Sequence, residues 1–220
     1  MLDTRFPRPR GDVGHPDTFP VPVRRRVVPG AFPRAVVASA AALRASGLAE
    51  RFSEALRALE AEGARALTTS CGFLVLLQRE LQAAVRVPLV SSTLLQLPQI
   101  LEREAEVGVL TISAEHLGEE HLLAAGVPPD RLRDVRVQGM DPRGPFARTI
   151  LGDLPEMDLA AARADVVAAA LSLRRRAPGL RTLVLECTNM PPHAEALADA
   201  TGWRVRTLLD AGPLLQWPHA

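Results

Sequence analysis

Lysine and tyrosine are absent from this sequence, and all 26 of its basic residues are arginine. Lysine forms Schiff bases with carbonyl substrates and with pyridoxal phosphate, binds phosphate in P-loops and activates serine in Ser-Lys pairs. None of these chemistries is available to the chain. Any reaction on an amino acid must therefore proceed without an imine.

Excess charge and clustered cysteines are also missing. The chain has 26 basic and 25 acidic residues, a net charge of +1, so no basic field is expected to hold a nucleic acid or an anionic membrane. Its two cysteines, Cys71 and Cys187, are 116 positions apart, and neither belongs to a C-x-x-C motif. This spacing argues against structural zinc. We expect no metal, no organic cofactor, no nucleic-acid partner and no membrane partner.

The composition is that of a globular protein. Of 220 residues, 47% are hydrophobic, enough for one large or two small cores. The start, Met1 to Arg5, carries charge where a signal peptide needs apolar residues, and no apolar run approaches the ~18 residues of a membrane span. We expect a soluble cytoplasmic protein with reduced cysteines. A loop-rich opening extends to about Arg34, with a short extended run over Val21–Val28.

Short apolar runs alternate with helical patterns along the rest of the chain. A glycine or proline usually separates the two kinds of segment. This alternation predicts parallel βαβ units and an α/β fold. The predicted strands are 64–69, 87–90, 107–113, 135–138 and 181–186, and the predicted helices include 94–104, 115–125 and 159–176.

The two cysteines occupy matching places in this pattern. Cys71 follows Gly63 by 8 residues, and Cys187 follows Gly179 by 8 residues, in each case across a short apolar strand. The repeat indicates two pseudo-symmetric lobes, each a mostly parallel sheet flanked by helices. Because ligands of open α/β sheets bind at the carboxyl ends of strands, we expect both thiols in an active site in the inter-lobe cleft.

The same pattern assigns the lobe boundaries. The first lobe is predicted to comprise residues 1–94 together with a returning segment, 205–220. The second lobe is predicted to comprise 95–204. If Met1 and Leu2 belong to a first strand, that strand is short enough to suggest residues before Met1.

Two opposed thiols can act as acid and base. Helix N-terminal amides stabilise a thiolate, so we expect the pKa of each thiol to be lowered toward neutrality. A proton removed from one face of a carbon and returned to the other inverts its configuration. The backbone amides at Gly72, Phe73, Thr188 and Asn189 are candidates to bind a substrate carboxylate.

The segments Thr68–Leu74 (TTSCGFL) and Glu186–Pro192 (ECTNMPP) resemble the two cysteine motifs of the aspartate/glutamate racemase superfamily. The resemblance, which spans Asp3 to about Pro192, implies two pseudo-symmetric α/β domains and cofactor-independent catalysis with one cysteine from each half. It implies Cys71 and Cys187 as the catalytic pair. It further implies substrate contacts from Asp3, Thr4, Thr69, Ser70, Thr188 and Asn189.

Departures from the motifs leave the substrate open. Amino-acid racemases of the group typically carry Asn-Thr after the first cysteine, and glutamate racemases carry Thr-His after the second, where this chain has Gly72-Phe73 and Thr188-Asn189. We expect racemisation or epimerisation of a small carboxylate. Maleate isomerases, arylmalonate decarboxylases and hydantoin racemases belong to the same superfamily, so their reactions are alternatives. A non-catalytic binder and a thiol redox sensor are alternatives from outside it, and a homodimer stays open.

Three further residue types have a functional and an ordinary interpretation. Arg5 is a candidate to bind a second carboxylate, although an arginine beside proline-rich sequence is also common at surfaces. Glu186 is a candidate to orient the thiol or to bind an ammonium group, although it can also simply pack at the strand end. His116 and His121 lie about 140° apart on a helix and cannot share a metal, so we expect a solvated helix face there.

Overall fold

The predicted strands assemble into two parallel sheets in the computed structural model, which describes residues 1–212. One sheet has two strands in the order β1-β2, and the other has four in the order β4-β3-β5-β6. All pairs are parallel, so the expected α/β class is confirmed. The strands are β1 Leu67–Thr68, β2 Leu89–Val90, β3 Val107–Thr111, β4 Val135–Gly139, β5 Thr182–Leu185 and β6 Arg204–Arg206.

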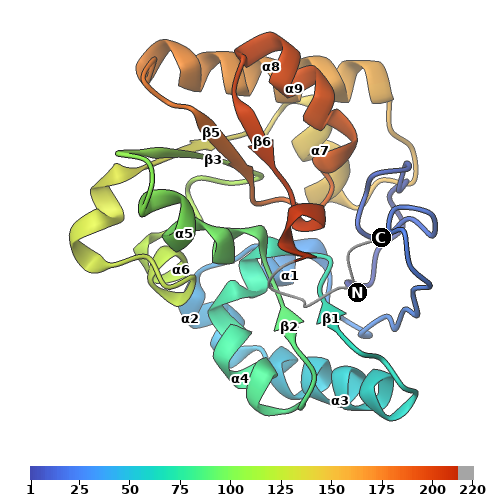
Figure 1. Ribbon diagram of the computed structural model, residues 1–220. Coiled ribbons are helices and arrows are strands. Elements are labelled where there is room, and N and C mark those ends of the chain that lie inside the picture. The colour runs from blue at the N-terminus through green and yellow to red at the C-terminus, as the bar shows by residue number, and fades with distance from the viewer. Residues whose placement is uncertain (213–220) are drawn as a thin grey trace.

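Helices cover both sheets (Figure 1). Helices α3 and α4 lie beside β1 and β2, and α7, α8 and α9 lie beside the larger sheet. The α-helices are α1 Pro33–Val36, α2 Ala40–Ala45, α3 Leu48–Ala61, α4 Gln78–Ala83, α5 Leu97–Leu101, α6 Glu119–Ala124, α7 Pro145–Gly152, α8 Leu159–Arg176 and α9 Ala194–Thr201. The 3₁₀ helices are η1 Gly72–Leu77, η2 Thr93–Gln96, η3 Pro129–Asp134, η4 Pro191–His193 and η5 Leu208–Ala211.

The longest helix, α8, has the bounds predicted from the sequence. The Asp158 side chain accepts hydrogen bonds from the amides of Ala160 and Ala161, which caps its N-terminus. Three arginines occupy its last turn, where cations suit the helix dipole. Its buried residues, Ala162, Val166, Ala170 and Leu173, recur every three or four positions and face the larger sheet.

The opening segment differs from the prediction. Residues 21–28 form no strand, because Pro20 and Pro22 have no amide hydrogen to donate to a ladder. Met1 and Leu2 are not in a strand either, although the Val28 amide donates to the Met1 carbonyl and the Asp3 amide donates to the Ala31 carbonyl. The segment is therefore held by isolated backbone bonds.

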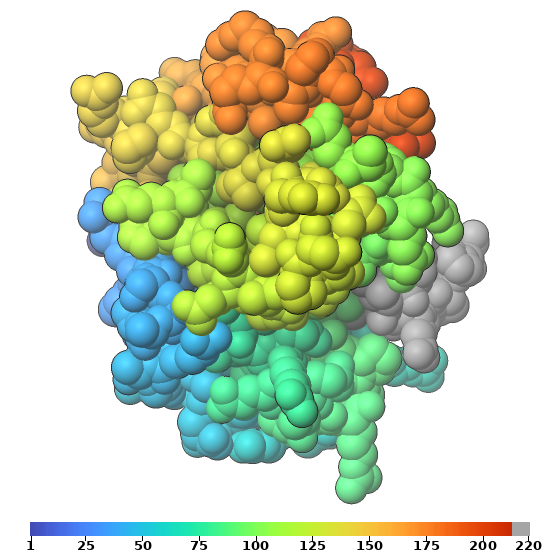
Figure 2. Space-filling view, turned by 90° about the vertical axis from the view of Figure 1, so that its left-hand side faces the viewer, coloured from blue at the N-terminus to red at the C-terminus, as the bar shows by residue number. Residues whose placement is uncertain are grey.

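Several element boundaries also differ. Strand β1 has two residues where six were predicted, and the helix predicted to begin at Glu115 begins at Glu119 after Gly118. Helix α7 and strand β6 were not predicted. The segment around α6 and η3, lime to yellow in Figure 2, lies between the α8 region and the α2 to α4 region on this face.

The core joins both sheets. One buried cluster contains Phe73 after β1, Leu94 in η2 and Leu110 in β3. A smaller cluster places Leu208 and Ala211 of η5 against Val90 of β2. The returning segment is described only to residue 212, and the rest of the predicted 205–220 segment lies outside the described residues. The lobe boundaries at 94/95 and 204/205 stay a prediction.

Candidate active site

Cys71 lies in a turn fixed by the residue two positions before it. The Thr69 hydroxyl donates to the carbonyl of Ser91 at 2.7 Å and lies 3.1 Å from the carbonyl of Cys71, while the Cys71 amide lies 3.4 Å from the same hydroxyl. Cys71 itself is the N-cap of η1. Thr69 therefore holds the turn to the end of β2 and sets the direction of the thiol.

The opening segment is attached to the same turn. The Ser70 hydroxyl oxygen accepts a hydrogen bond from the Leu2 amide at 2.9 Å. Leu2 and Phe6 are both buried. The first residues of the chain thereby form part of the wall next to Cys71, even though they form no strand.

Cys187 follows β5 in the larger sheet and has polar neighbours of its own. Its thiol donates to the Asn189 side-chain oxygen at 3.5 Å, and the Asn189 amide group donates to the carboxylate of Asp12 at 2.6 Å. Asp12 is paired with Arg8 at 2.9 Å. This chain of contacts connects Cys187 to a buried ion pair in the opening loop.

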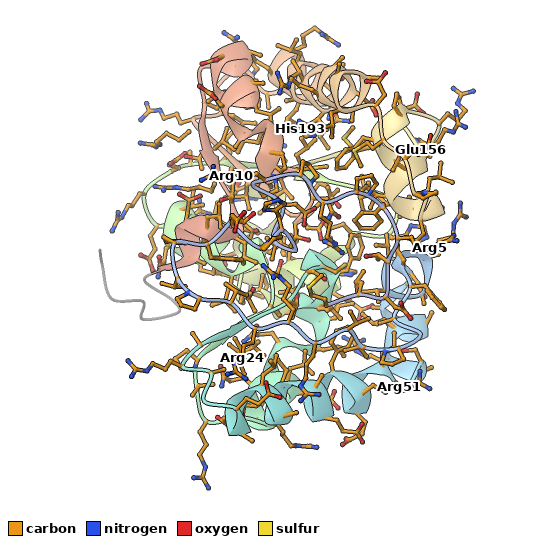
Figure 3. The ribbon with its side chains drawn as sticks, turned by 90° about the vertical axis from the view of Figure 1, so that its right-hand side faces the viewer. Arg5, Arg10, Arg24, Arg51, Glu156 and His193 are labelled. Atoms are coloured by element: carbon orange, nitrogen blue, oxygen red, sulfur yellow. The ribbon has the colours of Figure 1, made fainter. Side chains whose placement is uncertain are left out.

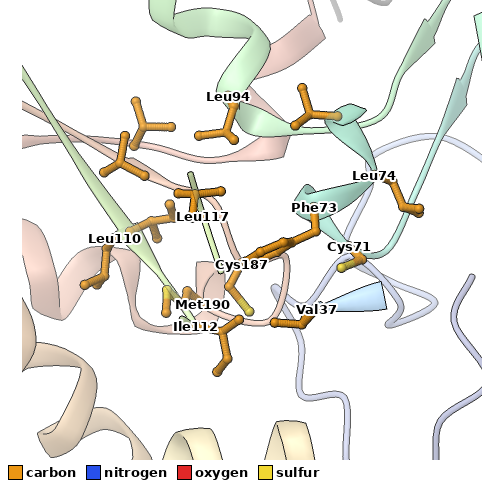
Figure 4. Close-up of a cluster of buried hydrophobic side chains, with 14 of the residues drawn as sticks. Val37, Cys71, Phe73, Leu74, Leu94, Leu110, Ile112, Leu117, Cys187 and Met190 are labelled. Atoms are coloured by element: carbon orange, nitrogen blue, oxygen red, sulfur yellow. The ribbon is translucent and has the colours of Figure 1, made fainter. Parts of the chain in front are cut away.

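The two cysteines line one cavity, as predicted from their matching turns. Figure 4 shows Cys71 and Cys187 entering the same cluster from different elements, with Phe73 and Val37 between them in this view. The cavity has a volume of about 20 Å³, room for about one water molecule. Its lining comprises Leu2, Phe6, Pro33, Val37, Ser70, Cys71, Gly72, Phe73, Ile112, Ile150, Glu186, Cys187, Thr188 and Asn189.

The predicted contact residues fall into two groups. Five of the nine line the cavity, and four lie outside its lining. Asp3 accepts from the Gly30 amide, Thr4 accepts from Arg8, and Thr69 braces the Cys71 turn. The Arg5 side chain is 73% exposed, pairs with Asp153 and lies toward one edge of the molecule in Figure 3. The five contact residues that line the cavity, together with Cys71 and Cys187, are Ser70, Gly72, Phe73, Thr188 and Asn189.

Burial reverses the expected direction of the thiol pKa values. The pKa of each thiol is raised above its ordinary value, first by loss of water and second by the nearby Glu186 carboxylate. The amides of Phe73 and Leu74 and the charge of Arg8 act in the opposite direction on Cys71 but are weaker. The expectation of lowered pKa values is therefore wrong for the closed cavity.

Glu186, for which the sequence left open both a packing role and a role in the site, lines the cavity. It is 1% exposed, and burial raises its pKa to about 7. One carboxyl oxygen accepts from the Thr111 hydroxyl at 2.8 Å, and the other has no hydrogen-bond partner among the described residues. The available sequence signal was an acidic residue at the end of an otherwise apolar strand, directly before a cysteine.

Arg8 and His121 are two further basic residues whose side chains are largely buried. The Arg8 guanidinium is largely buried against the Phe6 ring, 4.7 Å from its centroid, whereas Arg5 is exposed. His121 is 1% exposed and packs edge-on against Phe73, so its predicted place on a solvated helix face is wrong. Helix α6 packs that face against η1, which sequence periodicity could not reveal.

Two negative findings apply to residues 1–212. No group of three or more histidine, cysteine or acidic side chains in this part of the chain is placed to hold a metal ion. Within the same range, no helix combines the length and apolar character that crossing a membrane requires.

The chain has relatives that can be recognised from sequence similarity. No protein-family model matches the chain. A dimethylsulfoniopropionate lyase of Durusdinium sp. clade D is 28% identical over 208 residues, covering 91% of this chain and 67% of the relative. Dimethylsulfoniopropionate lyase 6 of Emiliania huxleyi is 30% identical over 216 residues, covering 91% of this chain and 53% of the relative.

These relatives correct the functional expectation. The chain spans between 53% and 67% of the length of these two relatives. Both are named as lyases, and our expectation of a racemase or epimerase is wrong on this ground. The alternatives drawn from the sequence, which were isomerisation, decarboxylation, ligand binding and redox sensing, did not include this reaction either.

Similarity to solved structures concerns the fold. A protein from Yersinia pestis assigned as an Asp/Glu racemase superposes with a TM-score of 0.51 at 17% identity, covering 81% of this chain and 78% of that chain. A mutant of arylmalonate decarboxylase gives a TM-score of 0.51 at 14% identity, covering 78% and 76%. Together with the two cysteine turns, these matches confirm the resemblance stated from the motifs: the chain has the fold of the aspartate/glutamate racemase superfamily.

Proposed function

We propose that the protein is a lyase that cleaves dimethylsulfoniopropionate or a closely similar carboxylate with a sulfonium group on its β-carbon. The observation that carries the proposal is the similarity to curated lyases of that name across 91% of the chain. The cavity supports it, since two thiols and a free hydroxyl surround a space lined mainly by apolar side chains.

The reaction needs one base. A base removes a proton from the carbon next to the carboxylate, the electron pair forms the carbon–carbon double bond, and the bond from the β-carbon to sulfur breaks. The products are dimethyl sulfide, acrylate and one proton. Because dimethyl sulfide leaves as a neutral molecule, the leaving group requires no proton from a second acid.

Cys71 is the better candidate for this base. The amides of Phe73 and Leu74 and the positive charge of Arg8 all favour its thiolate. At Cys187 only the Asn189 amide favours the thiolate, and the negative charge of Asp12 adds to the opposing effects of burial and Glu186. These surroundings favour Cys71 over Cys187 as the group that removes the proton.

Thr188 is the candidate to bind the substrate carboxylate. It lines the cavity, and its buried hydroxyl has no hydrogen-bond partner among the described residues. A hydroxyl that donates to the carboxylate becomes more strongly bonded as negative charge develops there during proton removal. The cavity holds about one water in the closed state, so a substrate enters only when the surrounding segments separate.

The test is a direct assay of the purified protein. Incubation with dimethylsulfoniopropionate is expected to release dimethyl sulfide, measured by gas chromatography, together with an equal amount of acrylate. Absence of both products at high enzyme concentration would refute the proposal. A cytoplasmic location is part of the proposal, since both thiols are free and must stay reduced to act as bases.

A further inference from the structure

The cavity has an unusual charge distribution for a site that takes a carboxylate. Among the described residues that line it, Glu186 is the one acidic side chain, and neither arginine nor histidine contributes. The remaining lining is largely apolar and includes the rings of Phe6 and Phe73. Glu186 and the two thiols are thus the ionisable groups of a cavity whose other lining residues are largely apolar.

Only one of the two carboxyl oxygens of Glu186 has a hydrogen-bond partner among the described residues. The Thr111 hydroxyl donates to Oε2 at 2.8 Å, whereas Oε1 is buried and lacks a partner among the described residues. A buried carboxylate oxygen without a partner is costly and needs an explanation. A ligand that brings positive charge to Oε1 would remove that cost.

The backbone provides space for this arrangement. A Cβ atom built on Gly72 would overlap Oε1 of Glu186 and the Glu186 carbonyl oxygen. The carboxyl group therefore packs directly on the α-carbon next to Cys71. Glu186 therefore lies against the Cys71 turn while it directly precedes Cys187 in the chain.

No positively charged side chain among residues 1–212 bonds to Oε1 of Glu186. The Arg8 guanidinium stacks on the Phe6 ring, but it is paired with Asp12 at 2.9 Å and bonds Thr4. Arg8 is also absent from the residues that line the cavity. The positive group that Oε1 lacks must therefore come from the ligand.

We propose that Glu186 binds the cationic methylated head of the substrate and selects carboxylates with an onium group on the β-carbon over neutral carboxylates of the same shape. This inference rests on the proposed function for the position of the onium group. Methylated cations are recognised in proteins by aromatic faces and carboxylates that replace their hydration. Phe6, Phe73 and Glu186 supply both kinds of group.

The test uses two ligands that differ in charge and share a shape. These are 3-(trimethylammonio)propionate and 4,4-dimethylpentanoate, whose trimethylammonium and tert-butyl heads are isosteric. Isothermal titration calorimetry measures the Kd of each on the full chain. The wild-type protein is expected to bind the cationic ligand about tenfold or more tightly than the neutral one, the range of a desolvated contact to a cation.

Glu186→Gln is expected to abolish this preference, and Glu186→Asp, which keeps the charge, is expected to retain part of it. Glu104→Gln is the matched control. Glu104 also accepts from a threonine hydroxyl, that of Thr182, and its Oε2 is buried with no partner in residues 1–212. It differs in lying outside the cavity and in pairing with Arg204. That variant is expected to keep the wild-type preference. Circular dichroism establishes that each variant is folded.

The outcomes separate the two proposals. A Glu186→Gln variant that keeps the full preference for the cationic ligand, or a wild-type protein without any preference, overturns the role of Glu186. A wild-type protein that prefers the cationic ligand but releases no dimethyl sulfide overturns the proposed reaction and leaves the onium site standing. Because calorimetry does not depend on turnover, each result can be read without the other.

Discussion

The carboxyl group of Glu186 rests on the α-carbon of Gly72, with no space between them for a side chain. The two residues come from different sheets, since Gly72 follows β1 and Glu186 follows β5. A single close contact therefore connects the two cysteine turns. A side chain larger than hydrogen at position 72 would disrupt this contact.

Gly72→Ala is expected to displace the Glu186 carboxyl group and to lower the free energy of unfolding by about 1–3 kcal/mol, the usual cost of overpacking a core. Dimethyl sulfide release is expected to fall with it. Urea denaturation and the product assay measure the two effects. Gly118→Ala is the control, since no atom lies near its Cβ position and its φ is −87°. Equal stability of the two variants would contradict the contact.

Cys71→Ser is expected to lower kcat by about a hundredfold or more, because the hydroxyl is a far weaker base than the thiolate at neutral pH. In the wild-type protein the pKa of this thiol is raised, so the thiolate fraction grows with pH. The value of kcat/KM is therefore expected to increase between pH 7 and pH 9. A larger loss in Cys187→Ser than in Cys71→Ser would reverse the assignment of the base.

Asp12→Ala is expected to destabilise the protein by about 3 kcal/mol, because it leaves the buried Arg8 guanidinium without its partner. The side chains of Arg8 and Asp12 are 12% and 1% exposed, and Asn189 loses a bond as well. Glu120→Ala is the comparison, since Glu120 pairs with Arg44 in solvent. That variant is expected to change stability by less than about 1 kcal/mol. Thermal and urea denaturation measure the stability of both variants. A similar loss of stability in Asp12→Ala and Glu120→Ala would show that burial does not strengthen the Arg8–Asp12 pair.

His121→Leu is expected to make the protein less sensitive to acid. Burial lowers the pKa of His121 to about 4, whereas the ordinary pKa of a histidine, which applies in the unfolded chain, is 6.5. The folded state therefore binds this proton less readily, and stability is lost as pH falls from about 6.5 through about 4. His193 contributes in the same direction, since burial also lowers its pKa to about 4.

The measurement is the difference in unfolding free energy between pH 7 and pH 5. His121→Leu is expected to reduce this difference by about 1–3 kcal/mol, on the basis of about 1.4 kcal/mol for each unit of pKa shift. His15→Gln, in a partly exposed turn, serves as the control and is expected to leave the difference close to that of the wild-type protein. If the difference is unchanged in His121→Leu, burial does not lower the pKa of this histidine in the folded protein.

The local pattern of residues was enough to place the two thiols. Each lies at the end of an apolar strand before a helical segment, and parallel strands bring such turns to the same edge of their sheets. Helix α8 was predicted to the residue because its cap, its apolar spacing and its terminal arginines are all local signals. The reaction could not be predicted from these local patterns, because the same two-cysteine motifs occur with several reactions in the superfamily.

The residue pattern was sufficient to predict an α/β chain with parallel sheets and one cysteine after a strand of each sheet, since these features follow from periodicity and turn chemistry. Tertiary packing buries Arg8 while Arg5 stays exposed, and it leaves one oxygen of Glu186 without a partner in the part of the chain that the structure describes. It also decided that the pKa of each thiol rises instead of falling. The physical reason is that desolvation and charge proximity depend on which distant segments pack together, and no local pattern encodes that.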